Sequence, residues 1–225
     1  MFSLRVRLLK SVVLFIFTGT LFLQSVHAKT TTKTSGDYTY EITKDKTLTI
    51  TKYTGKSKEI TIPEQIDGKN VYTIGDGAFQ DCSTLKEVSL PNSVIKVGKR
   101  TFSGCSNLKS ITIPKQVTSI GDWAFSECSN LKLVILPDTL VSIGEGTFRE
   151  CLSLRSITLP GTLTSIGDYA FSRCKSLKSL TLPDSVTSLG KTVFSGCISL
   201  KSITLSNSVT SIRENTFSSC KSLEN

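Results

Sequence analysis

Seven cysteines and one histidine are the residues of this chain best suited to nucleophilic or metal chemistry. The histidine, His27, lies in an N-terminal leader described below, so neither Ser–His nor Cys–His activation nor a histidine metal site is expected in the exported protein. Acidic residues recur on one repeated turn instead of converging as a catalytic pair: Asp76, Asp122, Glu145, Asp168 and Glu214. There is no glycine-rich phosphate loop, and we expect no enzyme and no cofactor.

The spacing of the cysteines decides what they can do. Each follows the previous one by 23 residues: Cys82, Cys105, Cys128, Cys151, Cys174, Cys197 and Cys220. Equal spacing places them in a line, which cannot surround a zinc ion tetrahedrally. Neighbours about 5 Å apart at Cα would be within reach of a disulfide. The alternatives are therefore occasional pairing and a column of small, buried thiols, and we favour the second.

The same interval governs the rest of the chain from residue 79 onward. Phe recurs at positions 79, 102, 125, 148, 171, 194 and 217, and Leu at 85, 108, 131, 154, 177, 200 and 223. A fixed period of this length indicates a solenoid. A single coil would leave both of its flat faces in water, so stacking on neighbouring coils is obligatory.

The elements that position these residues are best seen in one coil, residues 108–128. Ile111 and Ile113 alternate with polar residues, which predicts a short strand. Pro114 ends the strand, because proline has no N–H to donate. Gly121 is expected to turn the chain with a positive φ. Phe125 and Cys128 then fill the far side of the coil.

The pattern Leu-x-x-Ile-x-Ile-Pro, followed by Ile-Gly and Ala-Phe-x-x-Cys, resembles the BspA-like or treponemal-type leucine-rich repeat over residues 60–224. The usual Asn of the leucine-rich motif is absent, and the last copy has Ser206 and Arg213 in place of Pro and Gly. The resemblance implies a right-handed, β-rich solenoid of seven 23-residue repeats. It also implies a surface or secreted protein used for adhesion or protein recognition, although fold alone does not fix function.

The chain outside the repeats divides into three parts. Residues 1–28 form a predicted signal peptide, with basic residues, an apolar core over 11–23 and small residues before Ala28. No other apolar run is long enough to span a membrane, so we expect a periplasmic, cell-surface or secreted protein. Residues 29–36 are interpreted as a flexible tether and residues 37–59 as a β-hairpin cap. The solenoid is assigned to residues 60–225.

Three surface features are candidate binding sites. An outward basic column precedes the strands, and Leu133 and Ile135 make an apolar patch beside it. The aromatic side chains of Trp123 and Tyr169 share one variable slot two coils apart and could anchor a partner or cover the edges of core Phe rings. The basic column consists of Lys86, Lys109, Lys132, Arg155, Lys178 and Lys201. Such a column is either a solubility device or a track for an acidic partner.

The leading hypothesis is an exported, non-enzymatic interaction module or adhesin. Its partner is expected to be an extracellular or cell-surface protein with acidic character, or an acidic glycan. Nucleic acid is excluded, because the compartment is wrong and no aromatic residues interleave the cations. The alternative is a structural protein. In it, Phe217 and Leu223 of a last coil with no cap after it drive assembly into a homo-oligomer or surface layer.

Overall fold

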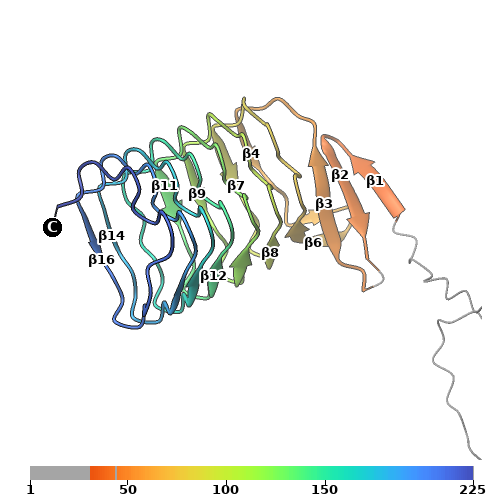
Figure 1. Ribbon diagram of the computed structural model, residues 1–225. Coiled ribbons are helices and arrows are strands. Elements are labelled where there is room, and N and C mark those ends of the chain that lie inside the picture. Colours follow the sequence, from red (N-terminus) through yellow and green to blue (C-terminus); the bar gives the residue numbers. More distant parts are fainter. Residues whose placement is uncertain (1–30, 44, 225) are drawn as a thin grey trace, which may run out of the picture.

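The computed structural model describes residues 31–43 and 45–224, and Figure 1 shows a stack of coils built from short strands and turns. Over these residues no helix is found, and hence none that could cross a membrane. The predicted signal peptide lies outside the described residues. The strands are β1 (Thr31–Ser35), β2 (Tyr38–Ile42), β3 (Leu48–Tyr53), β4 (Glu59–Thr61), β5 (Gln65–Ile66), β6 (Lys69–Ile74), β7 (Glu87–Ser89), β8 (Lys96–Val97), β9 (Ser110–Thr112), β10 (Ser119–Ile120), β11 (Leu133–Ile135), β12 (Ser142–Ile143), β13 (Ser165–Ile166), β14 (Ser179–Thr181), β15 (Ser188–Leu189) and β16 (Ser202–Thr204).

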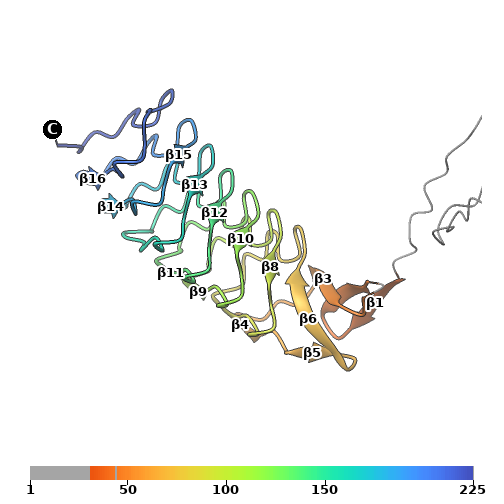
Figure 2. The same ribbon diagram turned by 90° about the horizontal axis from the view of Figure 1, so that it is seen from below.

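Two sheets run along different sides of the stack, as the view in Figure 2 shows. The long sheet has the order β1-β2-β3-β6-β8-β10-β12-β13-β15. The second sheet, here called the interrupted sheet, consists of β4-β7-β9-β11 and, separately, β14-β16. Residues 156–159 stand between these two parts and form no strand. The predicted solenoid of seven coils with a hairpin cap is confirmed.

The cap is larger than the sequence predicted. β2 and β3 form the expected antiparallel hairpin, and β3 then pairs in parallel with β6. The predicted tether over residues 29–36 is wrong for Thr31–Ser35, which pair with β2 in the register Thr31↔Ile42. An edge strand can form without apolar residues, because backbone hydrogen bonds hold it and both of its faces stay in water. The β-branched Thr residues favour that extended conformation.

Stacked phenylalanines form the axis of the core. Ring centroids of successive coils lie between 5.1 Å (Phe79–Phe102) and 5.8 Å (Phe171–Phe194) apart, and the rings are nearly parallel. Tyr53 of β3 continues the stack 5.1 Å from Phe79. The cap is thereby joined to the coils through the core as well as through the long sheet.

The prediction that Gly121 turns the chain with a positive φ is wrong. The left-handed conformation lies two residues later, at Trp123, and again at Glu127, with φ of 60° and 63°. Gly121 is needed because its α-carbon packs on the preceding coil, where an added Cβ would come within 2.5 Å of the Gly98 carbonyl carbon. Close approach of two backbones, rather than backbone conformation, therefore requires glycine here.

Backbone hydrogen bonds also join the coils on the side away from the sheets, called here the turn side. The Phe102 N–H donates to the Ala124 carbonyl at 2.8 Å, and the Phe125 N–H donates to the Thr147 carbonyl at 2.9 Å. Equivalent bonds start from Trp123 and Glu127, the two left-handed positions. The left-handed φ values recur because each coil repeats this arrangement.

Candidate interaction surfaces

The basic column lies at one edge of the interrupted sheet, and its geometry is set by the backbone. The Lys109 N–H donates to the Lys86 carbonyl at 3.0 Å and the Lys132 N–H to the Lys109 carbonyl at 2.8 Å, so neighbouring cations lie one strand spacing apart. Lys86 is half-buried and the other five residues are exposed. No ion pair among the described residues involves the column. Its charge is therefore free to act on a partner.

The predicted apolar patch coincides with the break in the interrupted sheet. Leu133 and Ile135 point outward from β11 and are 53% and 49% exposed. Beside them a groove of about 300 Å³ runs between β11 and the strandless segment, and Ile157 and Pro160 line its other side. No backbone hydrogen bond between β11 and residues 156–159 occurs in the described structure. The apolar patch thus borders a groove at the place where the two coils are least tightly joined.

A second hollow, of about 620 Å³, lies over β4, β7 and β9. It is lined by exposed hydroxyl groups and by two acids, Glu59 and Glu87. These acids offset the positive field of the basic column near the cap. The uncompensated positive charge therefore lies farther along the sheet, around Lys109, Lys132 and Arg155.

The structure brings Trp123 and Tyr169 together although they are two coils apart. Their ring centroids lie 6.4 Å apart with the planes 25° from parallel. Gly146, in the coil between them, has no side chain, and a Cβ there would overlap the Trp123 ring. The guanidinium carbon of Arg149 lies 5.9 Å from the Trp123 ring centroid. Both aromatic side chains are therefore held by neighbours, with Tyr169 37% exposed.

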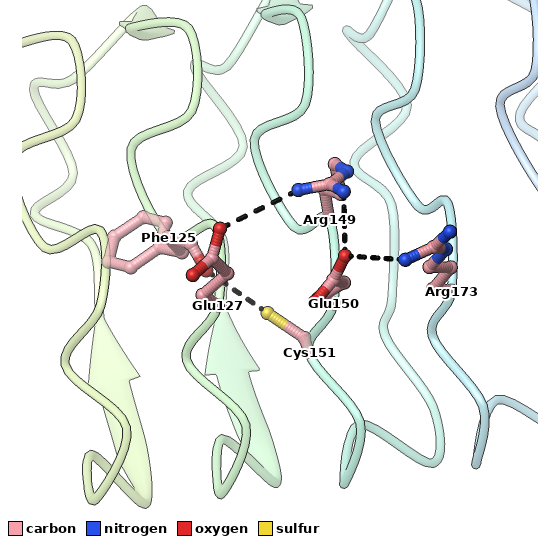
Figure 3. Close-up of polar contacts among 6 residues, drawn as sticks. All are labelled: Phe125, Glu127, Arg149, Glu150, Cys151 and Arg173. Atoms are coloured by element: carbon pink, nitrogen blue, oxygen red, sulfur yellow. Dashed lines mark hydrogen bonds and ion pairs between the residues drawn. The ribbon is translucent and has the colours of Figure 1, made fainter.

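A network of charges on the turn side escaped the sequence analysis. Glu150 binds Arg149 at 2.6 Å and Arg173 at 3.1 Å, and Arg149 also reaches Glu127 at 3.6 Å. Figure 3 shows these four side chains side by side on successive coils. Glu127, Glu150 and Arg173 occupy the second left-handed position, four residues after the aromatic slot. Acidic and basic residues that recur at this one repeat position were the sequence signal that could have revealed the network.

The cysteines are free thiols, and the five inner ones are buried. Each thiol from Cys105 onward contacts the preceding coil: Cys151 Sγ donates to the Phe125 carbonyl at 3.2 Å (Figure 3) and Cys128 Sγ to the Phe102 carbonyl at 3.1 Å. Burial raises the pKa of Cys128 and of Cys197 to about 12. Such thiols stay protonated at neutral pH and are poor nucleophiles. The predicted buried column is confirmed for these five, whereas Cys82 and Cys220 are half-buried.

The three aspartates among the acids of the repeated turn, Asp76, Asp122 and Asp168, each bind a backbone N–H group. Asp76 Oδ1 accepts a hydrogen bond from the Lys99 N–H at 2.8 Å, and Asp122 Oδ1 accepts one from the Glu145 N–H at 3.0 Å. Among the described residues, no group of three or more His, Cys, Asp or Glu side chains could hold a metal ion.

The residues predicted to drive self-association lie in the last described coil. Phe217 and Leu223 are half-buried, whereas their equivalents Phe194 and Leu200 are fully buried. Ile212 of the same coil is 46% exposed. In the described residues each of these side chains has a neighbouring coil on one side only.

Stacked coils with short strands, a proline after the strand position in all but the last coil, and inward columns of Leu, Phe and Cys define a leucine-rich-repeat solenoid. The model of the BspA type leucine rich repeat region matches six copies over residues 49–161 and 142–225, and the chain belongs to this family. The resemblance inferred from the sequence is therefore confirmed.

Several solved structures are similar to the chain. The leucine rich repeat protein of T. pallidum is 28% identical with a TM-score of 0.57, over 86% of this chain and 91% of that chain. A leucine rich cell surface protein of Faecalibacterium prausnitzii is 25% identical with a TM-score of 0.38, over 88% and 82% of the respective chains. A leucine-rich repeat protein of Bacteroides ovatus is 25% identical with a TM-score of 0.43, over 88% and 80%. No curated protein matches the chain.

Proposed function

We propose that this chain is an exported, non-enzymatic adhesin that binds an acidic protein on its interrupted sheet. The observation that carries the proposal is the groove beside Leu133 and Ile135, which lies within the exposed stretch of the basic column. An apolar centre with a charged rim is the usual anatomy of a protein-binding surface.

The two parts of this surface have different physical roles. Burying Leu133 and Ile135 under a partner would contribute roughly 1.5–3 kcal/mol for each side chain. The cations would speed and orient the encounter with an acidic surface, and salt would screen their effect. An acidic glycan would use the cations alone, because it offers little apolar surface to the patch.

Export rests on the predicted signal peptide, and surface exposure is consistent with the family. The absence of catalysis rests on the chemistry already described: the inner thiols are protonated, and three of the repeated acids are bound to backbone N–H groups. Periplasmic, surface and secreted locations all fit a leader of this kind.

The proposal is tested with the mature chain against immobilised extracellular matrix proteins and heparin. Leu133→Ser combined with Ile135→Thr should weaken protein binding about tenfold or more. Lys109→Ser, Lys132→Ser and Arg155→Ser together should weaken it and flatten its dependence on salt. Ile95→Thr with Val141→Thr is the matched control, because these residues are similarly exposed at 46% and 44% but precede strands of the long sheet.

Two outcomes would contradict the proposal. If the paired Leu133 and Ile135 substitutions bind as tightly as the wild type, the patch is not the contact. If the charge variant retains both affinity and salt dependence, the basic column acts as a solubility device.

Self-assembly through the last coil is a second proposal, supported by the half-burial of Phe217 and Leu223 and the exposure of Ile212. Sedimentation velocity at about 100 µM, far above the Kd of a micromolar interface, should show a defined oligomer of the mature chain. Phe217→Ser with Leu223→Ser should make it monomeric. A wild-type monomer at that concentration removes this proposal.

A further inference from the structure

Trp123 stands beside two adjoining hollows on the corner between the long sheet and the turn side, away from the interrupted sheet. The larger hollow has a volume of about 570 Å³ and the smaller one about 330 Å³. They share Gln80, Arg100 and Trp123 as a common wall. Together they form an open, mostly polar surface with one aromatic wall, of a size that fits a small ligand.

The indole of Trp123 is fixed before any ligand arrives. On one side it packs over Gly146 and against Tyr169, and the backbone N–H of Trp123 donates to the Glu145 carbonyl at 2.6 Å. Neither hollow includes Gly146 or Tyr169, so the hollows border another part of the indole. The Arg149 guanidinium, 5.9 Å from the ring centroid, lines the smaller hollow. A ring that is already immobilised loses little conformational entropy when a ligand stacks on it.

The polar groups around the larger hollow fall into two sets. Lys99 is held by Asp122, whose carboxylate lies 2.9 Å from its ammonium nitrogen, and this hydrogen bond raises the pKa of Lys99. Within the described residues, the side chains of Gln80, Arg100 and Glu145 make no hydrogen bond or ion pair. They offer an amide, a guanidinium and a carboxylate, which supply both donors and acceptors.

We propose that this corner is a saccharide-binding site, in which a neutral sugar ring of a glycan stacks on Trp123 and its hydroxyls bind Gln80, Arg100 and Glu145. A hydroxyl both donates and accepts, so it can use the guanidinium and the carboxylate together. An anionic sugar is disfavoured, because Asp76, Asp122 and Glu145 face two cations in the larger hollow. A cation is disfavoured by the positive charge of Arg100, which lines both hollows. This site is independent of the protein-binding sheet proposed above.

The experiment uses the fluorescence of Trp123, the single tryptophan of the chain. The mature chain is titrated with maltotriose, cellotriose, chitotriose, mannotriose and a β-galactotriose, and binding is checked by saturation-transfer NMR. We expect a saturable change with at least one of these sugars. Trp123→Ala, followed by NMR, should weaken binding about tenfold or more, as truncation of a central aromatic contact does.

Gln80→Ala and Glu145→Gln keep the proposal testable if the Trp123 variant misfolds, because both side chains are exposed and unbonded. Each should weaken binding several-fold without changing the unfolding midpoint. Glu214→Gln is the matched control, since Glu214 occupies the same repeat position as Glu145 but the preceding coil has Thr192 at the slot that Trp123 occupies before Glu145. No binding of any of the five sugars at about 10 mM, or binding that Gln80→Ala and Glu145→Gln leave intact, overturns the proposal. So does saturable binding of a trilysine peptide in place of the sugars.

Discussion

Gly146 gives the sharpest test of the packing on the turn side, because Gly77 provides a matched control. Both glycines occupy the first left-handed position, with φ of 56° at Gly146 and 62° at Gly77. A residue with a Cβ is strained in the left-handed conformation, and this strain should lower the free energy of unfolding by the same amount in both alanine variants, about 1–2 kcal/mol. Their surroundings differ, since an added Cβ would overlap the Trp123 ring at Gly146 but would meet only the flexible tip of Gln80, at 3.3 Å, at Gly77.

The extra cost at Gly146 can be worked out from what Trp123 would lose. Displacing the indole removes the stacked contact with Tyr169, worth about 0.5–1.5 kcal/mol, and the contact with the Arg149 guanidinium, worth about 0.5–1 kcal/mol. Gly146→Ala should therefore lower the free energy of unfolding by roughly 1–2.5 kcal/mol more than Gly77→Ala does.

Urea denaturation followed by far-ultraviolet circular dichroism measures both free energies. Tryptophan fluorescence supplies an independent readout, because the displaced indole should emit at longer wavelength in Gly146→Ala and not in Gly77→Ala. Equal destabilisation with unchanged emission in both variants would refute the claim that the Trp123 ring packs against Gly146.

The remaining predictions concern the core, the thiols and the leader. Phe125→Ala should lower the free energy of unfolding by about 3–5 kcal/mol in urea denaturation. Phe217→Ala should lower it by about half as much, because Phe217 is half-buried and has one ring neighbour where Phe125 has two. Equal losses would show that stacking between rings does not determine the contribution of each Phe to stability. Thiol reagents should label Cys82 in the native protein and Cys128 after unfolding, and early labelling of Cys128 would contradict its burial. Because the pKa of Cys128 is raised from 9.0 to about 12, the folded thiol keeps a proton that the unfolded thiol loses, so above pH 9 this residue should cost about 1.4 kcal/mol of stability per pH unit until about pH 12. N-terminal sequencing of the exported protein should begin at Lys29, and retention of Met1 would contradict cleavage.

The repeat period made the core predictable but left the surface contacts undetermined. A period of 23 residues fixes which side chains share a column, so the Phe stack and the buried thiols follow from counting alone. The cap strand β1 could not be found in this way, because its stability comes from backbone bonds to β2 and not from an apolar pattern. The pattern also assigned the wrong role to Gly121, since a close approach of backbones and a positive φ both select glycine.

The candidate surfaces were likewise predictable from the sequence only in part. The basic column and the apolar patch were visible as residue types at one repeat position. The break in the interrupted sheet beside the patch was not, because residues 156–159 carry the same pattern as the strands on either side. The packing of Trp123 on Gly146 depends on the residues that two neighbouring coils have at the same repeat position, so it could not be predicted from the pattern of one coil.

The backbone bonds of the turn side have an electrical consequence. Phe102 donates to the carbonyl of Ala124, and the other end of that same peptide unit, the Phe125 N–H, donates onward to Thr147. Peptide units are thus connected head to tail from coil to coil, and parallel rows run through the positions of Trp123 and Glu127 with the same direction. Each unit carries a dipole of about 3.5 D, and aligned units polarise one another. The turn side therefore carries aligned dipoles along the axis of the solenoid, with the positive pole toward the later coils and the negative pole toward the cap, whereas bonds beside the sheets, such as that from the Lys109 N–H to the Lys86 carbonyl, point the opposite way.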